Sequence, residues 1–269
     1  MFLVYFSYGD IPMSQYMLLA LPRSGSGWLA AQLEKNLDLQ YRWEYFSAYS
    51  PGGNKKYYGH EKHIKPLCGP TESWIEELDK LYQNTWLKEK ENFNFTKEVW
   101  SAFKLPFFIR HFNCFVLYRS RKLTFPSSIP EWPAAYYHSA CENFETLDDN
   151  LQQMIKVAKD FPNNINCVSM VGHTIAYYQL LMDAEQHNIP VINYTKLVTL
   201  PKGRLWTYME RKMQGVEVSD KLIDSVKQSA KKIDVTARLR NYDRSGLEAF
   251  YHKLIENVDY LPTIMEEDL

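Results

Sequence analysis

The segment of residues 17–29, MLLALPRSGSGWL, constrains the fold more than any other part of the chain. It opens with a continuous apolar run, which is typical of a short strand buried on both faces. Pro22 and Gly25 then interrupt the run. Residues 28–37 follow with leucines at positions 29, 33 and 37, the spacing of one helix face. The sequence therefore predicts a buried strand, a turn of small residues and an amphipathic helix in direct succession.

This succession predicts a binding place for an anionic group. Small residues in the turn allow backbone N–H groups to approach the anion, and the helix N-terminus adds a partial positive charge. An arginine supplies a full cation, and two serines supply hydroxyl donors. The candidate binding residues are Arg23, Ser24, Gly25, Ser26, Gly27 and Trp28.

Two common nucleotide-binding loops do not fit this turn. A Walker A loop ends in Gly-Lys-Ser/Thr, whereas this turn ends in Ser-Gly-Trp. A dinucleotide fingerprint needs three glycines in the pattern G-x-G-x-x-G, and only Gly25 and Gly27 are present. The turn therefore predicts a phosphate-type site of a different kind.

The rest of the chain alternates between strand-like and helix-like segments. This order favours an α/β fold with three layers, in which a mostly parallel sheet is flanked by helices. Ligands of such sheets bind outside the carboxyl ends of the strands, where the 22–27 turn is expected. We predict a single domain over residues 1–269. The further expected strands are 40–46, 112–118 and 189–194, and the further expected helices are 71–90, 151–161, 174–187, 204–213, 219–231 and 247–258.

Composition narrows the classes of partner. Lysine and arginine total 31 against 32 acidic residues, so no basic field for nucleic acid is expected. The four cysteines form no C-x-x-C pair, which suggests neither zinc nor redox chemistry, and Cys114 and Cys167 are expected to be buried thiols. The apolar run at residues 1–6 is too short to cross a bilayer and lacks a basic flank. A reducing cytoplasm is the expected compartment, and the oligomeric state stays open.

A second cluster of polar residues follows the apolar strand that ends at Tyr118. Residues 119–128 contain three cations and several hydroxyls, beginning with Arg119. A guanidinium binds phosphate with two parallel hydrogen bonds, and a hydroxyl can donate a third. The alternative interpretation of this stretch is a solvated basic loop.

The Pro-Arg-Ser-Gly-Ser turn after an N-terminal strand resembles the 5′-phosphosulfate loop of the sulfotransferase superfamily, whose donor is 3′-phosphoadenosine 5′-phosphosulfate (PAPS). The resemblance implies that Arg119 and Ser127, eight positions apart, hold the 3′-phosphate. The family continues into a helix through that serine, whereas prolines at positions 126, 130 and 133 are expected to interrupt it here, so Ser128 or Ser120 can replace Ser127.

Two later segments extend the same resemblance. Residues 191–197 match the Tyr-Glu-Asp-Leu strand end of the family at Tyr194 and Leu197, with threonine and lysine in place of the two acids. Many relatives close the 3′-phosphate site with a late basic segment, for which Arg238 and Arg240 are the candidates. The alternative for these two arginines is a solvated charged face.

The resemblance also implies a general base. Bacterial carbohydrate and glycolipid sulfotransferases have a similar Glu-Tyr-Phe at the end of the second strand, and Glu44 matches their catalytic glutamate. Its aromatic neighbours would raise the pKa of this carboxyl by desolvation, which suits a base. The alternative base is a histidine, as in the cytosolic branch of the superfamily, and His60 and His63 are the candidates. Both are otherwise ordinary surface histidines.

The resemblance therefore implies transfer of a sulfuryl group from PAPS to a hydroxyl, with catalysis by positioning and electrostatics, Arg23 among the catalytic residues and no metal. The expected acceptor is a carbohydrate or another small alcohol. Two alternatives stay open: a small-molecule kinase of P-loop type, and a non-catalytic module that binds a nucleotide or another anion.

Overall fold

The computed structural model describes residues 15–21, 24–43, 46, 68–70, 72–89, 94–99, 101–120, 131–213, 215–230 and 246–266. Its centre is a five-stranded sheet in the order β2-β3-β1-β4-β5, and all four pairings are parallel. This confirms the predicted α/β fold with a parallel sheet. The strands are β1 (Tyr16–Ala20), β2 (Tyr41–Trp43), β3 (Phe95–Glu98), β4 (Asn113–Tyr118) and β5 (Val191–Asn193).

Helices connect and flank these strands. The α-helices are α1 (Ser26–Asn36), α2 (Glu72–Leu81), α3 (Leu87–Glu89), α4 (Leu105–Phe108), α6 (Glu131–Glu142), α7 (Asp149–Ala158), α8 (Ile165–Gln186), α9 (Tyr194–Thr199), α10 (Lys202–Lys212), α11 (Asp220–Ala230), α13 (Glu248–Ile255) and α14 (Thr263–Glu266). A π-helical turn, Tyr82–Trp86, joins α2 to α3, and a short 3-10 turn, Phe144–Thr146, precedes α7. None of the helices in the described ranges is long and apolar enough to cross a membrane.

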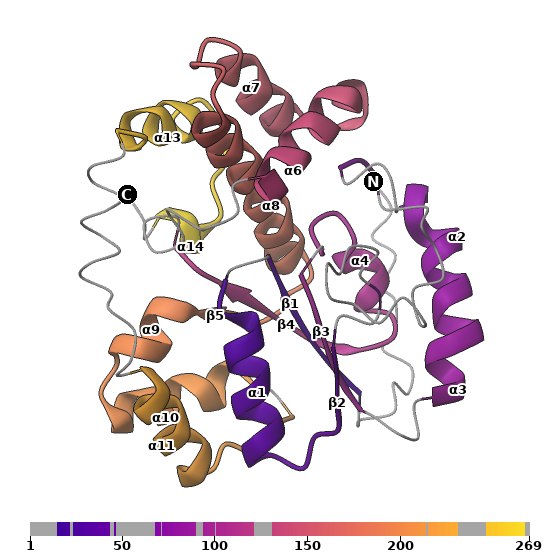
Figure 1. The fold of residues 1–269 in the computed structure, drawn as a ribbon, viewed down its shortest axis with the longest axis vertical. Coiled ribbons are helices and arrows are strands. Elements are labelled where there is room, and N and C mark those ends of the chain that lie inside the picture. Colours follow the sequence, from indigo (N-terminus) through magenta and orange to yellow (C-terminus); the bar gives the residue numbers. More distant parts are fainter. Residues whose placement is uncertain are drawn as a thin grey trace.

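The sheet separates two hydrophobic cores, because successive residues of a strand point to opposite faces. In β1, Met17 and Leu19 belong to one core together with residues of α4, α6, α7, α8 and α13. Leu18 and Ala20 belong to the other core, together with residues of α1, α9, α10 and α11. Figure 1 shows α1 and α9–α11 gathered on one side of the sheet, and α6–α8 and α13 on the other. The arrangement is therefore the three-layer form that the sequence predicts.

The order of the strands creates a topological switch point at the carboxyl ends of β1 and β4. From β1 the chain passes through α1 toward β2, whereas from β4 it passes through α6–α8 toward β5, in the opposite direction and on the opposite face. Connections of a single hand require this change of face. Because β1 and β4 are neighbours, their carboxyl ends form the switch point of the sheet, which is the usual ligand position in open parallel sheets; this position, between the residues that follow β1 and those that follow β4, is called the β1–β4 crevice below.

Most predicted elements are confirmed with shifted ends, but several described elements are not among those predicted. The expected runs at 17–20 and 112–118 are β1 and β4, and the 219–231 helix is α11, capped by the Ser219 hydroxyl, which accepts from the Leu222 N–H. The sequence patterns do not predict strand β3, whose last two residues are Lys97 and Glu98, or the helices α4, α6 and α14. Helix α8 begins at residue 165 rather than 174, since a buried helix has no polar face for a pattern to reveal.

Two predictions about local structure are wrong. Residues 194–197 do not continue a strand: they open α9, because the Asn193 side chain accepts a hydrogen bond from the Thr195 N–H at 2.8 Å and caps the helix. Pro133 does not prevent a helix either, because it is the third residue of α6. Amides of the first turn have no acceptor within a helix, so proline is tolerated there.

The longest helix packs closely on α6. A Cβ placed on Gly172 of α8 would lie 1.8 Å from the carbonyl oxygen of Pro133, so only glycine allows this approach of the two backbones. Cys114 and Cys167 are buried thiols, as predicted.

Candidate functional site

The loop after β1 is tightly folded around glycine. Gly25 has a φ of 95°, a conformation that favours glycine, and as the N-cap of α1 it offers no side-chain acceptor of its own to the helix amides. Ser24 is fully buried, and its hydroxyl oxygen accepts a hydrogen bond from the Ser26 N–H at 3.3 Å. The Leu29 N–H donates to the Gly25 carbonyl at 3.0 Å. The N-terminal end of an 11-residue helix thus lies directly beside the β1–β4 crevice.

Arg119 lies across the crevice, directly after β4. It is only 5% exposed. Its backbone N–H donates to the hydroxyl of Tyr177 on α8 at 3.3 Å. Its guanidinium carbon lies 4.4 Å from the ring centroid of Tyr194, the first residue of α9. A buried cation is thus fixed at the carboxyl end of β4.

The Tyr194 ring also contacts the loop side of the crevice. A Cβ on Gly25 would lie 2.6 Å from the Tyr194 Cε2, so the loop backbone closes onto the ring. The Trp28 ring meets the same tyrosine edge to face, with centroids 5.8 Å apart and planes at 72°. The structure therefore brings together three of the predicted positions, Gly25, Trp28 and Arg119, around one aromatic side chain.

Charged residues are also buried at the end of β3. Lys97 and Glu98 are 3% and 2% exposed. The Glu98 carboxylate accepts the Phe46 N–H at 2.7 Å and the Thr96 hydroxyl at 3.4 Å. A buried carboxylate is stable only where hydrogen bonds replace water. Glu98 thereby holds the Phe46 backbone at the same edge of the sheet as the crevice.

The structure describes only part of the predicted set of site residues. Gly27 and Trp28 are in the first turn of α1, and Ser120 is buried beside Arg119. The remaining candidates lie outside the described residues; they are Arg23, Glu44, His60, His63, Ser127, Ser128, Arg238 and Arg240.

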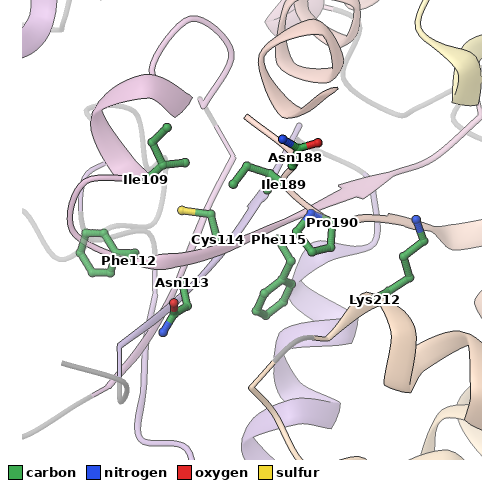
Figure 2. A pocket seen from close by; sticks show the side chains of 9 residues that line it. All are labelled: Ile109, Phe112, Asn113, Cys114, Phe115, Asn188, Ile189, Pro190 and Lys212. Carbon is green, nitrogen blue, oxygen red and sulfur yellow. The ribbon is translucent and has the colours of Figure 1, made fainter. Parts of the chain in front are cut away.

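A cavity of about 170 Å³ lies elsewhere, at the amino ends of β4 and β5. Figure 2 shows Ile109 and Phe112 on one side of it, Ile189 and Asn188 above the strand and Lys212 on the far side. Cys114 lines the cavity, and burial raises the pKa of its thiol. This is the opposite edge of the sheet from the Gly25 loop, so the cavity is separate from the candidate site.

Sequence reasoning missed three residues that shape the crevice: Tyr177, Glu98 and Tyr194 in its role as a ring contact. For Glu98 a signal existed, because a lysine and a glutamate stand between aromatic and β-branched residues at positions 95–99. Charges inside a strand-like run indicate a buried polar function or an edge strand. For Tyr177 the sequence carries no signal, because an aromatic residue in a helix is normally expected to pack in the hydrophobic core.

The arrangement can bind an anion that carries two negatively charged ends. One end would meet the backbone amides at the start of α1, and the other would meet the guanidinium of Arg119. Comparison with protein-family models, curated proteins and solved structures found no match to this chain.

Proposed function

We propose that the chain is a PAPS-dependent sulfotransferase, which moves a sulfuryl group to a hydroxyl of a small-molecule or glycan acceptor. One observation carries the proposal. The Ser24–Gly27 loop follows β1, Arg119 follows β4, and both strands end at the same crevice. PAPS carries a phosphosulfate at one end and a 3′-phosphate at the other. Two separated anion-binding positions, the Ser24–Gly27 loop and Arg119, therefore match its charge distribution, and they are called the two anion grips below.

The residues present fit this donor. Gly25 allows the loop backbone to lie directly against the Tyr194 ring, which a Cβ would prevent, and so brings the start of α1 close to the residue that Arg119 contacts. Arg119 is a buried cation in the described part of the chain, and it is aligned by an aromatic ring. Under the proposal, the α1 amides and Arg23 hold the phosphosulfate, and Arg119 with a serine of the 120–128 segment holds the 3′-phosphate.

The donor supplies an activated sulfur–oxygen bond. The acceptor oxygen attacks the sulfur while the bond between sulfur and the bridging phosphate oxygen breaks. The acceptor proton passes to Glu44, and the leaving product is 3′-phosphoadenosine 5′-phosphate (PAP). Arg23 and the α1 N-terminus stabilise the negative charge that develops on the bridging oxygen. No metal takes part in this scheme.

Calorimetry with PAP and with ATP tests the proposal. We expect micromolar PAP binding by the wild type and a loss of at least about tenfold in Arg23→Ala and Arg119→Ala, since a charged hydrogen bond contributes roughly 1.5–3 kcal/mol. Arg110→Ala is the matched control, because Arg110 is an exposed arginine just before the amino end of β4. Tighter binding of ATP than of PAP would reject the proposal in favour of a kinase.

Turnover separates an enzyme from a binding module. A library of sugars and alcohols with labelled donor identifies the acceptor class. With a working acceptor, we expect Glu44→Gln to keep PAP affinity and to lose turnover. Normal turnover by Glu44→Gln would exclude this base, and His60→Ala and His63→Ala are then the next variants. PAP binding without turnover on any acceptor would indicate a non-catalytic module.

A further inference from the structure

The Tyr194 ring occupies a position that the proposed reaction does not by itself explain. It is the first residue of α9, and it is 3% exposed. One contact is with the Arg119 guanidinium, at 4.4 Å from its centroid. The others are with Gly25 and Trp28, on the loop and the first turn of α1. A single rigid ring therefore lies between the two grips of the crevice.

We propose that Tyr194 is a positioning residue whose ring fixes the Arg119 guanidinium relative to the Gly25 loop, and so sets the spacing between the two anion grips. The inference rests on the proposed function, and it adds how the 3′-phosphate grip is held. A guanidinium stacked on an aromatic face keeps its plane and leaves its N–H edge to form paired hydrogen bonds. The ring performs this role, not the phenolic hydroxyl.

The surrounding contacts make the ring and the arginine a rigid pair. The Asn193 side chain caps α9 through the Thr195 N–H at 2.8 Å, which fixes the helix start that carries Tyr194. On the other side, the Tyr177 hydroxyl accepts the Arg119 N–H at 3.3 Å. Backbone and guanidinium of Arg119 are thus held from two different helices, on opposite faces of the sheet.

The spacing role also explains why glycine stands at position 25. The loop backbone approaches the ring so closely that a Cβ would overlap the Tyr194 Cε2 at 2.6 Å. A larger residue would push the ring away from the loop. Because Arg119 lies on that ring, its guanidinium would move as well. The distance between the two grips is therefore set by packing that passes through Tyr194.

Two variants of the tyrosine test the proposal by PAP calorimetry. We expect Tyr194→Leu to weaken PAP binding about tenfold, because cation–π stacking and alignment are lost. We expect Tyr194→Phe to stay within about twofold of the wild type, because the ring remains. Equal losses in the two variants would overturn the proposal, since the hydroxyl would then be the active group. Thermal unfolding by circular dichroism checks that each variant is folded.

A double-mutant cycle separates positioning from a general structural effect. If Tyr194 acts through Arg119, then Arg119→Ala costs less than about threefold in PAP affinity in the Tyr194→Leu background, against its full effect in the wild type. Fully additive losses would overturn the proposal.

Failure of the proposed function is recognised separately, because the wild type would then not bind PAP. In that case, modification by phenylglyoxal, followed by peptide mass spectrometry, measures how strongly the Tyr194 ring shields the Arg119 guanidinium. We expect slow modification of Arg119 in the wild type and in Tyr194→Phe, and faster modification in Tyr194→Leu, with the exposed Arg110 as the internal reference. Equal rates for Arg119 in all three proteins would overturn the proposal.

Discussion

Replacing Asp183 with asparagine tests the energetics of the helix that supports Arg119. Asp183 is on α8 and is 7% exposed. One carboxyl oxygen accepts from the Gln179 amide at 2.8 Å, and the other, Oδ2, has no hydrogen-bond partner among the described residues. Burial, and to a lesser degree the neighbouring Asp148, raise the pKa of Asp183 from 3.8 to about 7, although the Gln179 hydrogen bond opposes the shift.

The raised pKa of Asp183 determines how the free energy of unfolding changes with pH. Because the pKa of Asp183 is higher in the folded than in the unfolded chain, the folded state binds the extra proton between pH 4 and 7. The free energy of unfolding therefore falls as the pH rises through this window. The difference between a pKa of 3.8 and one of about 7, at about 1.4 kcal/mol for each pH unit, corresponds to roughly 4 kcal/mol in total. About 2–3 kcal/mol of it is lost between pH 5 and 8.

Asparagine has nearly the same shape as the protonated acid and does not titrate. We expect Asp183→Asn to be about as stable as the wild type near pH 4 and more stable by about 2–4 kcal/mol at pH 8. Urea unfolding followed by circular dichroism at pH 5, 6, 7 and 8 measures this difference. Asp160→Asn, at an exposed aspartate, is the control. Parallel stability curves for the wild type and Asp183→Asn would refute the reasoning.

Three further substitutions test the packing of the fold and of the site. Gly172→Ala should destabilise the protein by about 3 kcal/mol, because its Cβ would overlap the Pro133 carbonyl oxygen, and the denaturation midpoint measures this. An unchanged midpoint would show that α6 moves freely away from α8. Gly25→Ala would place a Cβ 2.6 Å from the Tyr194 ring at a residue whose φ is 95°. We expect it to lower PAP affinity at least about tenfold in calorimetry while the protein stays folded. Full PAP affinity in this variant would contradict the proposed site. Ser219→Ala should cost about 1 kcal/mol of unfolding free energy through loss of the α11 cap, and no change in the urea midpoint would argue against that cap.

Much of the candidate site could be predicted because its signals are local in sequence. One continuous segment contains the apolar run of β1, the glycine at position 25 and the leucines of α1. The strand, the turn and the helix can therefore be predicted together. Arg119 was likewise found because it directly follows a long apolar run. The roles of Arg23, Glu44 and the other candidates outside the described residues stay predictions.

The end of β5 and the whole of β3 were not predicted, because the polar residues in these segments obscure the strand pattern. The run at 189–194 looks like one continuous strand, yet it ends at Asn193, whose side chain prefers to cap α9. Strand β3 contains a lysine and a glutamate, which do not fit a buried strand pattern. Their burial becomes favourable only because β1 and β2 pair with β3 on its two sides and the Phe46 N–H donates to Glu98.

By itself, the sequence determined the alternation of strands and helices, and with it the parallel sheet and the loop at a strand end, because backbone periodicity and glycine freedom act within a few residues. The tertiary structure decided which strands have neighbouring carboxyl ends and which buried charged residues lie at the same edge of the sheet. It also decided that Tyr194 lies against both Gly25 and Arg119. These contacts join residues 25, 119 and 194, and no local pattern encodes a contact that depends on how distant elements pack.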